Sequence, residues 1–285
     1  MDKKKKTIEL SARLSAVAGM VTPGSRVADV GCDHGFVSIF LVQNGLASHV
    51  TAMDVRQGPL SRAREHVQQY GLSGYIDLRL SDGLSLLTPE DKTDCVILAG
   101  MGGRLMQRII ADALAKGLVI SQYVLQPQSE WAVLRRFLRE AGYRIVQEEM
   151  VLEDGKFYPV MKVQRGAAGS AEDGGTDSTE DSAAGSTEDS AAGSTEVSAK
   201  GSAKGSAEET AAGRSVPVEI PQEMADAFGP LLLAGRHSVL GIYLEQEIQK
   251  YDRILGQIAA KDENMEAARR SRLLKETYER FFSGK

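Results

Sequence analysis

Cysteine is scarce in this chain of 285 residues: Cys32 and Cys95 are its two cysteines, and they do not form a Cys-x-x-Cys pair. This argues against a disulfide framework and against a structural zinc site, and we predict no bound metal. Long apolar runs are also missing, and the basic residues Lys3, Lys4, Lys5 and Lys6 precede no apolar stretch of the kind found in signal peptides. We therefore expect a cytoplasmic protein without a membrane partner.

Aromatic residues are absent from residues 166–215, where Gly, Ala, Ser, Thr and Glu dominate and the octapeptide at 178–185 is repeated at 186–193. Such a segment cannot bury enough apolar surface to offset the entropy lost on ordering. We therefore predict a disordered, flexible linker at 166–215 between a first domain at 1–165 and a helical domain at 216–285.

Outside that linker, positively and negatively charged residues are nearly equal in number. The net charge of the chain is −5, but residues 1–165 hold 21 Lys and Arg against 18 Asp and Glu, whereas residues 166–215 hold 3 against 10. The acidity therefore belongs to the linker. A mildly basic first domain is compatible with RNA as a partner.

The first domain alternates predicted strands and helices. Strands are predicted at 27–30, 49–53, 75–80, 94–98 and 122–125, and helices at 8–21, 36–44, 59–70, 104–115 and 129–141, the last capped by Ser129. Two further strands, at 143–152 and 157–163, flank an Asp-Gly turn and predict an antiparallel hairpin, in which Pro159 indicates an edge position. Parallel strands closed by such a hairpin are more typical of the Rossmann-like α/β fold of class I methyltransferases than of nicotinamide dehydrogenases.

The helical domain carries an apolar stripe with spacings of three and four residues. Its members are Leu240, Leu244, Ile248, Tyr251, Leu255 and Ile258. This spacing is that of a coiled-coil-like helix. A polar break at 261–264 and a second apolar pattern from Met265 to Phe281 predict that two helices pack as an antiparallel hairpin.

The most informative run is Val-Ala-Asp-Val-Gly-Cys-Asp-His-Gly at 27–35, a strand that breaks into a glycine-containing turn before a helix. An acid closes each of the first three strands: Asp29, Asp54 and Asp82. We interpret the set as a site for S-adenosyl-L-methionine, in which Asp54 accepts the ribose hydroxyls and Asp82 with Gly83 holds the adenine. The Gly-x-Gly-x-x-Gly motif of dinucleotide folds is missing, and Asp33 would repel a pyrophosphate but attract a sulfonium.

A glycine-rich loop, Ala-Gly-Met-Gly-Gly at 99–103, follows the fourth strand. Many amino-group methyltransferases carry an Asp/Asn-Pro-Pro-aromatic motif there, and this chain does not. Glycines at this point let a flat base approach closely, and we hypothesise that Gln126, after the fifth strand, hydrogen-bonds the edge of that base.

Together these motifs, with Arg13-Leu14, Gly58-Pro59-Leu60, Asp82-Gly83-Leu84, Leu125-Gln126-Pro127 and Gly155-Lys156-Phe157-Tyr158, resemble the bacterial tRNA adenine-22 N1-methyltransferases of the TrmK type. The resemblance covers residues 8–165 and most of 216–285. It implies transfer of a methyl group from S-adenosyl-L-methionine to N1 of an adenine in tRNA. We predict no obligatory protein partner. The long linker looks like an insertion relative to that family.

The expected roles fall into three sets. Cofactor contacts are expected at Asp29, Gly31, Cys32, Asp33, Gly35, Asp54, Val55, Asp82, Gly83, Ala99 and Gly100. No certain catalytic residue is assigned, and the substrate-positioning set is Arg13, Met101, Gly102 and Gln126. RNA contacts are expected at Lys3, Lys4, Lys5, Lys6, Arg13, Arg56, Arg62, Arg64 and Arg104.

Two alternatives remain open at this point. The first is a methyltransferase of the same fold that acts on a small molecule or a protein. The second is an RNA-binding protein that has lost its catalytic activity and keeps the pocket as a relic.

Overall fold

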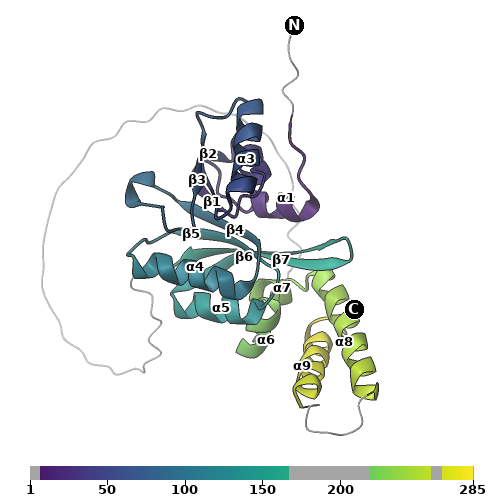
Figure 1. Ribbon diagram of the computed structural model, residues 1–285. Helices are drawn as coiled ribbons and strands as arrows, with labels where there is room; N and C mark the ends of the chain where they lie inside the picture. Colours follow the sequence, from purple (N-terminus) through teal and green to yellow (C-terminus); the bar gives the residue numbers. More distant parts are fainter. Residues whose placement is uncertain (1–6, 167–218, 258–264, 285) are drawn as a thin grey trace, which may run out of the picture. The chain divides into compact units, whose positions relative to one another are not determined.

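The computed structural model describes residues 7–166, 219–257 and 265–284. Seven strands form one sheet in the order β3-β2-β1-β4-β5-β7-β6 (Figure 1). In chain order they are β1 (Ser25–Val30), β2 (Ala47–Asp54), β3 (Ile76–Leu80), β4 (Cys95–Met101), β5 (Gln122–Pro127), β6 (Tyr143–Glu153) and β7 (Lys156–Arg165). The first five are parallel, and β7 runs antiparallel to both β5 and β6. The carboxyl ends of β1 to β5 therefore meet at one edge of the sheet, where ligands of open α/β folds bind.

Helices cover both faces of this sheet (Figure 1). They are α1 (Ala12–Gly19), α2 (Phe36–Gln43), α3 (Gln57–Gln69), α4 (Gly103–Ala115) and α5 (Trp131–Glu140), with a short 3-10 helix η1 (Pro89–Asp91) before β4. Successive residues of a strand point to opposite faces. Val27 and Ile97 accordingly pack into the core with α1, α2 and α3, whereas Ala28 and Leu98 pack into the core with α4 and α5. The predicted Rossmann-like α/β fold with its terminal hairpin is confirmed.

The C-terminal part is helical, with α6 (Gln222–Phe228), α7 (Pro230–Ala234), α8 (Ser238–Gln257) and α9 (Met265–Phe281). Helices α8 and α9 are antiparallel, because the Tyr278 hydroxyl donates to Glu245 while the Ser271 hydroxyl donates to Asp252. The predicted helical hairpin is therefore present. The end of its apolar stripe, Ile258, and residues 167–215 of the predicted linker lie outside the described residues.

A third apolar core joins these helices to the rest of the described chain. Phe228 and Leu244 are buried in it together with Met150 of β6, and Phe157 of β7 packs against them. A buried ion pair lies beside this core, with Arg135 Nε 3.0 Å from Glu148 Oε1 and the two side chains 1% and 0% exposed. The Glu148 carboxylate also accepts a hydrogen bond from the Leu231 backbone, at 2.9 Å.

One local prediction is wrong and another holds only locally. Ser129 does not cap α5: Glu130 occupies that position with φ of 57°, and the Ser129 hydroxyl donates to the Glu130 carboxylate instead. Strand β7 is not an edge strand as a whole, because it lies between β5 and β6. Its pairing with β5 covers only 161–164, so Pro159 lies in a part of β7 that has β6 alone as its neighbour, and the edge position predicted for Pro159 is confirmed. Among the helices that the structure describes, none is long and apolar enough to span a membrane.

Candidate functional site

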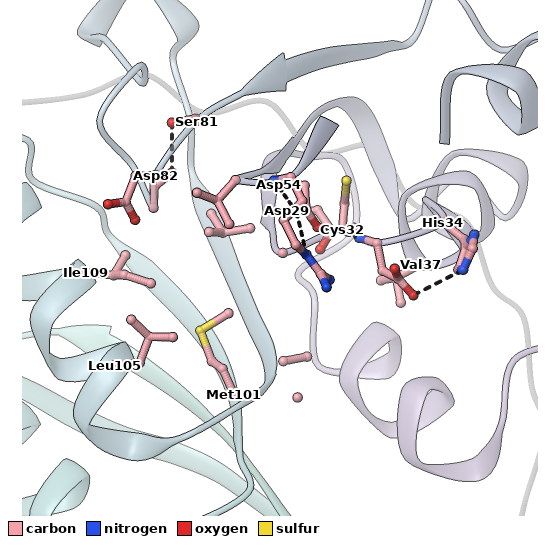
Figure 2. A pocket seen from close by; sticks show the side chains of 18 of the residues that line it. Asp29, Cys32, His34, Val37, Asp54, Ser81, Asp82, Met101, Leu105 and Ile109 are labelled. Carbon is pink, nitrogen blue, oxygen red and sulfur yellow. Dashed lines mark hydrogen bonds and ion pairs between the residues drawn. The ribbon is translucent and has the colours of Figure 1, made fainter. Parts of the chain in front are cut away.

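A cavity of about 660 Å³ opens at the carboxyl ends of the parallel strands (Figure 2). This volume lies in the range of small-molecule sites, about 300–1,000 Å³. The three acids that close β1, β2 and β3 all line it: Asp29, Asp54 and Asp82. Figure 2 shows Leu105 and Ile109 of α4 on the side of the cavity near Asp82, with Met101 beside them.

The turn after β1 brings bare backbone to the cavity. Gly31 has φ of 75°, in the left-handed region that favours glycine, and its N–H donates to the Met53 carbonyl at 2.8 Å. A Cβ at Gly31 would lie 3.3 Å from Cε of Met101, which lines the cavity opposite. The turn therefore leaves space between β1 and β4 that a side chain would fill. The other glycine, Gly35, does not line the cavity; it precedes α2 and faces Ala63 of α3.

Asp54 is fixed by the turns around it. Its carboxylate is 4% exposed and accepts backbone hydrogen bonds from Asp33, at 3.2 Å, and from Arg56, at 2.8 Å. A carboxylate has about four acceptor positions, so two remain for a ligand. A rigid acceptor pair at the end of β2 fits the diol of a ribose.

Asp29 is also 4% exposed, and it accepts a hydrogen bond from the Ser38 hydroxyl at 2.6 Å. Burial raises the pKa of its carboxyl to about 6, although the Ser38 hydrogen bond opposes that rise. A positively charged ligand in the cavity would favour the ionised carboxylate. Burial, and next the charge of Asp29, also raises the pKa of the Cys32 thiol, so Cys32 lines the site as a neutral thiol.

The end of β3 combines an exposed acid with an apolar wall. The Asp82 carboxylate is 71% exposed and lies 3.6 Å from Arg108 of α4. Gly83 has φ of 55°, and a Cβ there would lie 3.0 Å from Cγ1 of Ile109. Together with Val55 and Leu105, this wall leaves a slot that fits a flat base, with a carboxylate at its rim for the amino group. The donor set of the cavity thus fits a cationic nucleoside.

At the ends of β4 and β5 the structure differs from the hypothesis that Gln126 hydrogen-bonds the edge of the substrate base. Gln126 is fully buried, does not line the cavity, and accepts a hydrogen bond from Arg13 Nη1 at 2.7 Å. Gln128, two residues later, lines the cavity and is exposed. Arg13 also lines it, and its guanidinium lies over the Tyr158 ring at 5.3 Å.

The expected cofactor contacts and positioning residues come together almost completely. The cavity is lined by Arg13, Asp29, Gly31, Cys32, Asp33, Asp54, Val55, Asp82, Gly83, Ala99, Gly100 and Met101. Gly35, Gly102 and Gln126 do not line it.

The expected RNA contacts are more scattered. Arg56 lines the cavity, whereas Arg62, Arg64 and Arg104 are exposed outside it, and Arg104 Nε pairs with Glu130 at 3.1 Å. Lys3, Lys4, Lys5 and Lys6 lie outside the described residues.

Several lining residues were missed by the sequence analysis. Leu105, Arg108 and Ile109 come from one face of α4, and Phe36 and Val37 come from the start of α2. The sequence does carry a signal for α4. The helix begins at the end of the glycine loop, and its apolar residues at positions 105 and 109 are four apart, so they share one face.

Comparison with known proteins identifies the family. The family described as "Methyltransferase domain" matches residues 10–161. The tRNA (adenine(22)-N(1))-methyltransferase of Bacillus subtilis is 32% identical over 167 residues, covering 59% of this chain and 70% of the relative. This chain belongs to that methyltransferase family. The resemblance predicted from the sequence motifs is confirmed.

Solved structures of this methyltransferase family share its fold over nearly the whole chain. The B. subtilis m1A22 tRNA methyltransferase TrmK is 27% identical, with a TM-score of 0.69 over 94% of this chain and 98% of the other. A candidate tRNA (m1A22) methyltransferase of Streptococcus pneumoniae, solved in complex with S-adenosyl-L-methionine, is 26% identical, with a TM-score of 0.70 over 94% and 99%. The C-terminal helices are therefore part of the architecture that this family shares.

Proposed function

We propose that this protein is a tRNA (adenine-N1)-methyltransferase that methylates adenine 22 and uses S-adenosyl-L-methionine as its methyl donor. The observation that carries the proposal is the convergence of Asp29, Asp54 and Asp82 on one cavity at the ends of three adjacent strands. Family membership and the S-adenosyl-L-methionine complex of the S. pneumoniae relative support the same assignment.

Each part of the donor has a matching group in the cavity. The two unused acceptor positions of the Asp54 carboxylate would hold the ribose diol. The Asp82 carboxylate and the space above Gly83 would receive the adenine, and the turn at Gly31 would take the amino-acid portion. When bound, the donor supplies an activated methyl group on a sulfonium, whose positive charge Asp29 and Asp33 would attract.

The chain has no need of a general base for this reaction. N1 of neutral adenine carries a free lone pair in the ring plane, so no proton has to be removed before attack. The Cys32 thiol, whose pKa burial raises, does not supply a nucleophile. Catalysis then rests on aligning the two reactants, which is worth on the order of 7 to 11 kcal/mol.

The target base has to reach the cavity through an open mouth. N1 lies on the pairing edge of adenine, so the base has to be unpaired or flipped, at a cost of roughly a few kcal/mol. Arg56 at the rim, with Arg62, Arg64 and Arg104 on the exposed surface and Lys3 to Lys6 before α1, would contact the phosphates. Removing one such contact is expected to lower the slope of log affinity against log salt by about one unit.

Methyl transfer to unmodified tRNA is the test. Labelled S-adenosyl-L-methionine and unmodified tRNA are expected to give label in the RNA, whereas a methyltransferase for small molecules or proteins would leave the RNA unlabelled. A relic without activity would bind S-adenosylhomocysteine but transfer no label from S-adenosyl-L-methionine to the RNA, or would give no calorimetric signal with S-adenosylhomocysteine at all. A cytoplasmic location, which fits a tRNA substrate, is part of this proposal. The domain boundaries at 165 and 216 are part of it as well.

A further inference from the structure

We propose that Gln128 recognises the target base by pairing with its Hoogsteen edge: Oε1 accepts a hydrogen bond from the N6 amino group and Nε2 donates one to N7. This inference rests on the proposed function, because it specifies how adenine is selected. An amide paired in this way leaves N1 free to attack the methyl group.

Gln128 is placed and available for this role. Its backbone N–H donates to the Met101 carbonyl at 3.0 Å, which ties the end of β5 to the glycine loop. A Cβ at Gly100 would lie 3.8 Å from Gln128 Nε2, so the absence of that Cβ leaves room beside the amide. In the described part of the chain the Gln128 side chain forms no hydrogen bond, and it is exposed in the cavity wall.

The sheet order places Gln128 in the part of the cavity that would receive the methyl-accepting base, away from the cofactor adenine. Asp82 follows β3, whereas Gln128 follows β5, and the order β3-β2-β1-β4-β5 separates these strands by four spacings. At about 4.8 Å for each spacing, the strands are about 19 Å apart. A cofactor adenine held beside Asp82 is therefore out of reach of Gln128, which leaves the substrate base as its partner.

The chemistry of adenine selects an amide over the other groups nearby. Its N6 is a donor and its N7 an acceptor, so a side chain that both accepts and donates can pair with the two together. Among the described residues that line the cavity, Gln128 alone carries a side-chain amide. Arg13 offers donors only, and its Nη1 is already bonded to Gln126.

The alternatives to Hoogsteen pairing conflict with the reaction. An amide bonded to the N1 and N6 edge would occupy the lone pair that has to attack. A guanine in the same place would present O6 to Oε1, so two acceptors would face each other. The proposed pairing therefore gives both an open N1 and selection of adenine.

A cycle of protein and substrate changes tests the proposal. The substrates are one tRNA with adenosine at the target position and the same tRNA with 7-deazaadenosine there, which lacks the N7 acceptor. The wild-type protein is expected to lose about tenfold in kcat/KM on 7-deazaadenosine, in the range of one hydrogen bond to a base edge. Gln128→Ala is expected to lose at least tenfold on adenosine, and its further loss on 7-deazaadenosine is expected to be about tenfold smaller than that of the wild type.

The cycle also removes the chief confounding effect. The deaza substitution alters the nucleophilicity of N1, but it does so equally in both proteins, so only the difference between them reports the Gln128 contact. Gln147→Ala, an exposed glutamine on β6, is the control and is expected to behave as wild type. Binding of S-adenosylhomocysteine to Gln128→Ala is expected to stay unchanged, which shows that the cofactor half of the site is intact.

Two results would overturn the inference, and only the second would also overturn the proposed function. If Gln128→Ala loses on 7-deazaadenosine the same factor as wild type, Gln128 does not contact N7, although the enzyme remains a tRNA methyltransferase. If the wild-type protein methylates neither tRNA, the proposed function fails and the inference fails with it.

Discussion

Arg13 Nη1 donates a 2.7 Å hydrogen bond to Oε1 of Gln126, which joins the leading helix α1 to the end of β5. Gln126 has no exposed surface, whereas Arg13 lines the cavity. The Arg13 backbone N–H also donates to Glu153 at 3.2 Å. The buried amide therefore positions a cation in the wall of the site, and the base-contacting role predicted for Gln126 passes to Gln128 in the proposal above.

Gln126→Leu is expected to release Arg13 and to lower kcat/KM for tRNA about tenfold, with a loss of about 1–3 kcal/mol in the free energy of unfolding because a buried polar contact is broken. Gln126→Glu keeps an acceptor for Arg13 and is expected to restore activity toward wild type. Steady-state kinetics with both variants check this. Equal losses in the two variants would show that the Arg13 contact is irrelevant to the reaction.

Asp54→Ala is expected to weaken binding of S-adenosylhomocysteine by about 100-fold or more, since two charge-assisted hydrogen bonds to the ribose would be lost. Some stability is lost as well, because the carboxylate also accepts from the backbone of Asp33 and Arg56. Asp54→Asn keeps one carbonyl oxygen and is expected to fall between Ala and wild type. Calorimetry measures the affinity, and an unchanged dissociation constant in both variants would remove Asp54 from the cofactor site.

Asp29 predicts a pH dependence of stability in the protein without ligand. Its pKa is raised from 3.8 to about 6 by burial, so between these values the unfolded chain has released a proton that the folded chain still holds. Stability therefore falls as the pH rises from about 4 to 6, and the loss amounts to about 3 kcal/mol. Asp29→Asn cannot ionise and is expected to lack this contribution.

Urea unfolding at pH 4.5 and pH 7 for wild type and Asp29→Asn tests this, with the difference between the two proteins as the readout. The variant is expected to gain stability relative to wild type at the higher pH. A difference that stays constant across this range would mean that the Asp29 carboxyl titrates near its ordinary pKa.

The buried pair Arg135 and Glu148 predicts a strong stability effect far from the chemistry. Glu148→Gln leaves the Arg135 charge buried and unpaired, which costs about 3–5 kcal/mol. The matched control is the exposed pair Lys250 and Glu247, whose nitrogen and oxygen lie 2.9 Å apart. Lys250→Ala is expected to change stability by at most about 1 kcal/mol. Urea unfolding of both variants compares them, and equal effects would contradict a structural role for the buried pair.

Sequence reasoning was successful where local pattern determines structure. Buried parallel strands are continuously apolar and end at a turn, so the sequence alone assigns the acids at their ends, Asp29, Asp54 and Asp82, to one edge of the sheet. The helical hairpin followed equally from a stripe with spacings of three and four. These are short-range patterns, and the fold preserves them.

The other features could not be predicted from the sequence, because they depend on tertiary contacts. Gln126 and Gln128 differ in environment, because Gln126 lies within β5 and bonds Arg13, whereas Gln128 follows the end of the strand and is exposed. The Arg135 and Glu148 pair joins residues 13 positions apart, and no local pattern marks it. The helix start at Glu130 likewise depends on the Arg104 backbone and side chain, which bond to its carboxylate.

The most direct test of the account is to map the methylated nucleoside in a single unmodified tRNA transcript that carries adenine at position 22. After incubation with S-adenosyl-L-methionine, nuclease digestion and mass spectrometry are expected to find one N1-methyladenosine at that position, and none in a transcript with guanine there. Methylation at another atom or position, or no methylation of a transcript that a known relative modifies, would contradict the account.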